Sequence, residues 1–137
     1  MTGAASQKGA PHVAQGQLPP SLRTFVRRHL VTAADLEVLL LVHRERRPWT
    51  PTAVAKELRI HADQARGILS RLIASGLVQQ DGDDYHYRPK EVGLTEAVEE
   101  LVAFYPAYRV AIISLIFADR SDSMRDFSEA FRLRDDE

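Results

Sequence analysis

The apolar positions of the chain recur mainly three and four residues apart, the spacing of α-helices, and they divide it into short helical segments. We expect a first helix over residues 21–30 and a second over residues 33–47. The second is apolar over most of its circumference, which is typical of a helix at the centre of a domain. Thr32, followed three residues later by Asp35, predicts its N-cap, and Pro48 ends it.

Two more helices are expected in quick succession. Thr50 followed by Pro51 combines a capping hydroxyl with proline at the first helical position, which predicts a helix over residues 51–59. The next helix covers residues 62–75, and Gly76 follows it where helices commonly end in the left-handed conformation.

A β-hairpin is predicted after these helices. Two short β-prone runs, residues 77–80 and 85–89, flank the turn Asp81-Gly82-Asp83-Asp84. Trp49, flanked by turn residues further up the chain, is expected to form a short extended piece.

The C-terminal part of the chain is expected to be helical again. Its apolar residues follow a heptad pattern from Leu94 to Leu115. Pro106 predicts a kink or break near Tyr105, and residues 121–131 predict a final short helix. At the other end, residues 1–20 are rich in Gly, Ala, Gln, Ser and Pro and are expected to form a disordered arm.

The order of these parts resembles the winged helix-turn-helix superfamily, in particular the small MarR-like transcription regulators. The resemblance rests on TPTAVAKELRI, HADQARGILSRLIASGLV and QQDGDDYHYRP, and covers about 60 of 137 residues. It implies a mainly α fold with a small β-hairpin, centred on residues 30–89 within a domain of residues 21–90. Residues 91–137 then form a C-terminal helical extension. The implied function is a DNA-binding transcription regulator with the helix at about 62–75 in the major groove.

The charge of the chain is divided along its length. The net charge is −1 overall, yet residues 1–20 carry +1, residues 21–80 carry +5 and residues 81–137 carry −7. Such a division suggests that one part of the chain meets a polyanion. The alternative is that both parts are only solvated.

The candidate DNA-binding residues are mainly polar and basic positions around the two central helices. They are Lys56, Arg59, His61, Gln64, Arg66, Ser70, Arg71, Arg88 and Lys90. Arg44, Arg46 and Arg47 are expected to add electrostatic docking. The three carboxylates at the hairpin tip would repel phosphates. The rival interpretation is therefore a protein–protein adaptor that uses the acidic wing and the apolar C-terminal helix.

The breadth of the apolar face on the C-terminal helix favours a homodimer, with packing within the chain as the alternative. The candidate dimerisation residues are Leu101, Tyr105, Tyr108, Ile112, Leu115 and Ile116. A membrane-bound helix over residues 101–118 is a third interpretation, disfavoured by its length of 18 residues and by Arg109 in it.

No catalytic or metal chemistry is expected. The chain has no cysteine, its five histidines lack zinc-binding spacing, and His43 is expected to be a partly buried core residue. No phosphate-binding glycine loop or nucleophile motif is present in the sequence. We therefore expect a cytoplasmic protein that is not an enzyme and has no cofactor.

Overall fold

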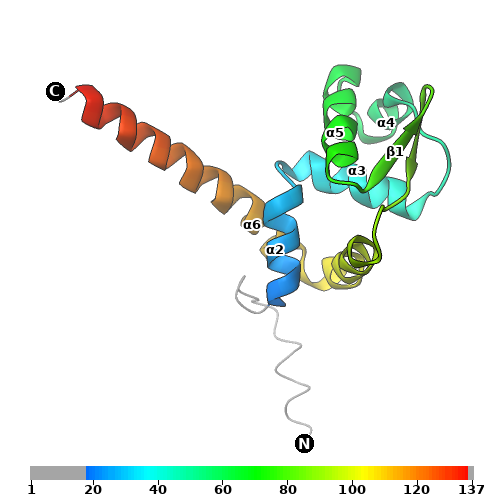
Figure 1. Ribbon diagram of the computed structural model, residues 1–137, viewed down its shortest axis with the longest axis horizontal. Coiled ribbons are helices and arrows are strands. Elements are labelled where there is room, and N and C mark those ends of the chain that lie inside the picture. Colours follow the sequence, from blue (N-terminus) through cyan, green and yellow to red (C-terminus); the bar gives the residue numbers. More distant parts are fainter. Residues whose placement is uncertain (1–17, 136–137) are drawn as a thin grey trace, which may run out of the picture.

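The computed structural model describes the backbone of residues 18–135 and the side chains of residues 18–118. Its elements, in chain order, are α2 (Pro20–His29), α3 (Ala33–Arg44), α4 (Pro51–Leu58), α5 (Ala62–Ala74), β1 (Val78–Asp81), β2 (Asp84–Tyr87) and α6 (Val92–Asp135) (Figure 1). Most of the predicted N-terminal arm, residues 1–17, lies outside the described residues. The predicted arm of residues 1–20 extends too far along the chain, because Leu18 is buried and Pro20 already belongs to α2.

Both predicted threonine caps are confirmed. The Thr32 hydroxyl accepts a hydrogen bond from the Asp35 backbone N–H at 3.1 Å, and the Thr50 hydroxyl accepts one from Ala53 at 3.1 Å. Each cap pairs a backbone donor that the first turn of a helix would otherwise leave free.

Helix α3 ends three residues earlier than predicted. Its C-cap, Glu45, is extended, and the Glu45 carbonyl accepts a hydrogen bond from the Trp49 indole at 2.9 Å. Pro48 disfavours the helical conformation only at Arg47, so the earlier end goes with the contact between Trp49 and Glu45. The short segment after α3 therefore turns back and brings Trp49 to the hairpin.

Helices α4 and α5 are joined by a tight turn. Arg59 caps α4 in the left-handed conformation, with φ of 59°, and Ile60 donates to the Ala55 carbonyl at 3.0 Å. At the other end of α5, Gly76 has φ of 80°, as predicted. A Cβ atom there would also lie 3.3 Å from Leu94 on α6, so this position favours glycine for two reasons.

The hairpin is confirmed as an antiparallel pair in which Val78 faces Tyr87 and Asp81 faces Asp84. Its two loop residues begin with Gly82, which has φ of 65°, as a tight hairpin turn requires. Trp49 forms a single β-bridge with Tyr85 and is buried, which confirms the predicted extended piece. Three helices, a tight turn and a hairpin in this order form a winged helix-turn-helix fold.

Helix α6 is kinked and has two arms. Tyr108 is non-helical, with φ of −120°, two residues after Pro106, so a kink near the predicted position is confirmed. We call residues 92–107 the first arm and residues 109–135 the second arm. The two arms point in different directions, and the second projects away from the winged domain (Figure 1). The chain stays helical through residues 121–131, so this part belongs to α6 and is not a separate short helix.

The second arm packs against α2 near the kink. Ala111, Ile112, Leu115 and Ile116 are buried in the same apolar core as Leu22 and its neighbours on α2. Residues 92–118 are the one stretch of the described chain that is long and apolar enough to cross a membrane. Burial inside the chain explains part of this apolar character.

Candidate nucleic-acid interface

Helix α5 buries one face and presents the other to solvent. Its buried residues, Ala65, Ile68, Leu69 and Leu72, are at most 1 % exposed. His61, Gln64, Arg66 and Ser70 are exposed. Gly67 has open space around its Cα, since a Cβ atom there would meet nothing within 4 Å. A second helix of this kind, with one polar face free along its length, is the element that enters the major groove in helix-turn-helix proteins.

All nine predicted DNA-binding residues are exposed, but they fall into three groups. Four lie on α5 itself: Gln64, Arg66, Ser70 and Arg71. Lys56, Arg59 and His61 lie around the turn before α5. Arg88 and Lys90 follow the hairpin, and the Lys90 backbone N–H donates to the Gly76 carbonyl at 2.8 Å, beyond the other end of α5. A helix of 13 residues is about 20 Å long, so these two groups lie far apart along α5.

Arg66 lies on the exposed face of α5 but has an acidic neighbour. Its guanidinium donates to the Asp63 carboxylate one turn earlier at 2.9 Å. The two side chains are 56 % and 98 % exposed, so water screens this pair and Arg66 can exchange partners easily. A phosphate could therefore replace Asp63 as its partner.

Arg71 has a structural partner that the sequence did not reveal. Its Nη2 and Nε atoms donate to the two oxygens of Asp35 on α3, at 2.7 and 3.0 Å. The Asp35 side chain has no exposed surface, and Thr32 and the Val31 backbone also donate to it. This geometry gives Arg71 a structural role, which is to hold α5 against α3. The base or phosphate contact that we predicted for Arg71 stays a prediction.

The charge state of Asp35 follows from these hydrogen bonds. Burial raises its pKa, but the hydrogen bonds from Arg71, Thr32 and Val31 lower it by more, so the pKa lies below the usual value. The hydrogen bond to Asp35 in turn raises the pKa of Arg71. The pair is therefore fully ionised at neutral pH.

The arginines after α3 are also engaged within the chain. Arg46 lies over the ring of Tyr87 and 3.6 Å from Glu99 on α6, and Arg47 lies over the ring of Trp49. Arg44 is 3.5 Å from Glu45. The carboxylates of Glu45 and Glu99 neutralise part of the positive charge that the sequence predicts for DNA docking.

Glu99 joins the first arm of α6 to the winged domain. It contacts the His43 ring at 2.9 Å, and His43 is only 13 % exposed, as expected for a partly buried core residue. Burial and the nearby Glu99 charge raise the pKa of Tyr87 to about 12, although Arg46 opposes this. The contacts of Glu99 thus hold the first arm of α6 against α3.

The tip of the wing is acidic, as the sequence indicates. Asp81 and Asp83 are exposed, and Asp84 is half-buried. Within the described side chains, no Lys or Arg forms an ion pair with any of them. A DNA backbone would be repelled at this tip.

Four of the predicted dimerisation residues are buried within one chain. They are Leu101, Ile112, Leu115 and Ile116, each at most 2 % exposed. Tyr105 and Tyr108 are half-buried. The large apolar side chains that α6 leaves exposed are different ones, Val92, Val110 and Phe117. Heptad spacing correctly found an apolar face, but α2 and the winged domain cover it.

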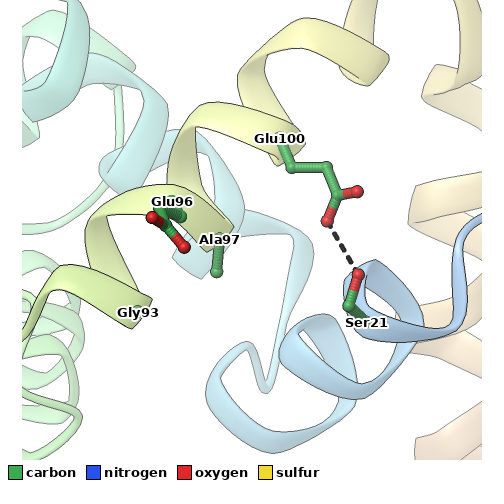
Figure 2. A pocket seen from close by; sticks show the side chains of 5 residues that line it. All are labelled: Ser21, Gly93, Glu96, Ala97 and Glu100. Atoms are coloured by element: carbon green, nitrogen blue, oxygen red, sulfur yellow. Dashed lines mark hydrogen bonds between the residues drawn. The ribbon is translucent and has the colours of Figure 1, made fainter.

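A hollow of about 360 Å³ lies between the start of α2 and the first arm of α6. It is lined by Ser21, Gly93, Glu96, Ala97 and Glu100, and the Ser21 hydroxyl donates to Glu100 at 3.0 Å (Figure 2).

Among the side chains that the structure describes, no group of three or more His, Asp or Glu could hold a metal ion.

No protein-family model matches the chain, and no curated protein is significantly similar to it in sequence. Among solved structures, a transcriptional regulator from Thermotoga maritima is similar, with 20 % sequence identity and a TM-score of 0.47 over 82 % of this chain and 81 % of that one.

Proposed function

We propose that this chain is a DNA-binding transcription regulator that inserts α5 into the major groove of double-stranded DNA. The observation that carries the proposal is the free polar face of α5 in a winged helix-turn-helix fold. Gln64 suits adenine, Arg66 suits guanine or a phosphate, and Ser70 can bond either a phosphate or a base edge. The order of its elements supports a regulator of the MarR-like kind, in the cytoplasm.

Residues around α5 also support insertion of this helix into DNA. Lys56 and Arg59 lie at the turn before α5 and form no ion pair among the described side chains, so both can contact phosphates. Because Gly67 has no side chain, a DNA strand can approach the backbone in the middle of α5. The acidic wing tip is not part of the proposed contact, because its carboxylates would repel phosphates.

Salt-dependent binding to duplex DNA tests the proposal. Wild-type affinity should fall steeply with salt, by about 0.9 in log–log slope for each phosphate contact. Arg66→Gln should weaken binding, whereas Asp63→Asn should strengthen it, because Asp63 both holds Arg66 and repels phosphates. Arg71→Ala is unsuitable as a probe because it leaves Asp35 buried without its partner.

Two results would contradict the proposal. One is a wild-type chain that shows no binding to random duplex at micromolar concentration and low salt. The other is equal binding by Arg66→Gln, Asp63→Asn and the wild type. A suitable control is Arg109→Gln, which removes one exposed charge from α6, outside the winged domain.

A protein–protein adaptor is the second candidate function. The unpaired carboxylates of the wing tip and the exposed Val110 and Phe117 of the second arm favour it. An adaptor would bind a basic partner protein and would not respond to the Arg66 and Asp63 substitutions. The homodimer stays part of the main proposal, now through the helix face that carries the exposed Val110 and Phe117.

A further inference from the structure

The charged residues of helix α2 are all basic. Its ten residues include Arg23, Arg27 and Arg28 and no acidic residue. Its buried residues are Leu22, Phe25 and Val26. Arg27 and Arg28 are exposed, while the Nε atom of Arg23 is buried without a hydrogen-bond partner in the described part of the chain.

Few of the basic residues of segment 21–80 outside α2 lack an acidic partner within the chain. Of the ten Lys and Arg between residues 21 and 80, five form ion pairs: Arg44, Arg46, Arg47, Arg66 and Arg71. The other five form none with described side chains, and three of them belong to α2. Helix α2 therefore carries two exposed arginines without an acidic partner among the described side chains, whereas each arginine of α5 has one.

The local electrostatics of α2 agree with this. Burial, together with the positive charge of Arg28, holds the pKa of His29 below its usual value, so His29 stays neutral at physiological pH. The charge of α2 is thus the charge of its arginines.

The end of α2 lies close to α5. One oxygen of Asp35 accepts hydrogen bonds both from the Val31 backbone, just beyond α2, and from Arg71 on α5. Arg28 lies only three residues before Val31, so the Cα atoms of these two residues are at most about 10 Å apart. The major groove is about 12 Å wide. If α5 lies in the groove, the end of α2 therefore lies near enough for a bordering strand to meet it.

We infer that α2 is a second DNA-contacting surface, which binds the phosphate backbone beside the groove through Arg27 and Arg28. This inference rests on the proposed function of α5. Its ligand is the phosphodiester backbone, so it adds affinity without reading sequence. Guanidinium groups suit this role because they bind phosphate oxygens with two parallel hydrogen bonds.

The test is fluorescence anisotropy of a labelled random duplex with the full chain across a salt series. The variants are Arg27→Gln and Arg28→Gln, with Arg109→Gln as the matched control because it also removes one exposed helical arginine. Each α2 variant should lower the log–log salt slope by about 0.9 and weaken binding roughly fivefold near 0.1 M salt. The control should bind like the wild type. Since Arg27 and Arg28 are exposed, thermal melts should match the wild type and confirm folding.

The outcomes separate the two proposals. Wild-type slopes for both α2 variants, or an equal loss in Arg109→Gln, would overturn this inference. If Arg66→Gln weakens binding in the same series, the proposed function of α5 survives that result. A wild-type chain that does not bind duplex DNA would overturn both.

Discussion

Asp35 and Arg71 form the most consequential side-chain contact of the winged domain. A fully buried carboxylate is tolerated only when donors surround it, and here a guanidinium, a hydroxyl and a backbone N–H all donate to Asp35. The pair links the first turn of α3 to the third turn of α5. Each residue therefore sets the position of an element that the proposed DNA contact depends on.

Arg71→Ala should lower the free energy of unfolding by about 3 kcal/mol, because it leaves a buried carboxylate without a counter-charge. Arg66→Ala is the matched control: it removes the same side chain from the same helix, but from an exposed ion pair worth about 0.5 kcal/mol. Urea denaturation followed by circular dichroism measures both. Equal losses in the two variants would contradict the role given to Arg71.

No sequence pattern could have revealed this contact directly. Asp35 and Arg71 are 36 residues apart, and each has a plausible local explanation, Asp35 as a helix-start residue and Arg71 as a surface charge. One signal was available: Asp35 stands directly beside the apolar run of α3, where a carboxylate needs a partner. Pairing across helices depends on packing, which local spacing does not encode.

At the scale of elements, the sequence predicted what local chemistry controls. The hydroxyls of Thr32 and Thr50 and the left-handed Gly76 act within a few residues, so the starts of α3 and α4 and the end of α5 were predicted well. The end of α3 was missed because it depends on Trp49 and its partner in the hairpin.

The two glycines at α5 give a pair of opposite predictions for one substitution. Gly67→Ala should raise the free energy of unfolding by about 1 kcal/mol, since the new methyl group enters open space in a helix interior. Gly76→Ala should lower it by about 1–2 kcal/mol, because φ of 80° strains alanine and its Cβ would crowd Leu94. Thermal and urea melts give the sign of each. A loss of stability in Gly67→Ala would show that its surroundings are not open.

At the scale of the whole molecule, the order of helices and hairpin was predicted, but the distribution of charge and apolar surface was not. The basic residues of the central segment were expected to act together, yet ion pairs engage Arg46 after α3 and both arginines of α5. The arginines of α2 form no ion pair with the described side chains. The heptad residues of α6 were expected to face another copy, yet most of them pack inside one chain. Both differences arise because a sequence shows which residues are charged or apolar but not which of them meet.

The exposed side of the second arm leads to a prediction about assembly. Val110 is 77 % and Phe117 is 56 % exposed, on a helix that projects from the domain. Static light scattering should give twice the chain mass of 15.4 kDa, and Phe117→Asp should give the single mass. Val92→Asp, which changes an equally exposed residue of the first arm, should stay dimeric. A wild-type monomer at tens of micromolar would contradict this prediction.

Trp49 has a practical consequence for studying this molecule. It is the only tryptophan in the chain, it is 1 % exposed, and it bridges α3 to the wing through Tyr85. Its intrinsic emission therefore reports on the surroundings of the indole, which include the docking of the hairpin on the helical core. A red shift would mark water reaching the indole as the wing detaches, which allows wing opening to be followed in the unlabelled protein, with or without DNA.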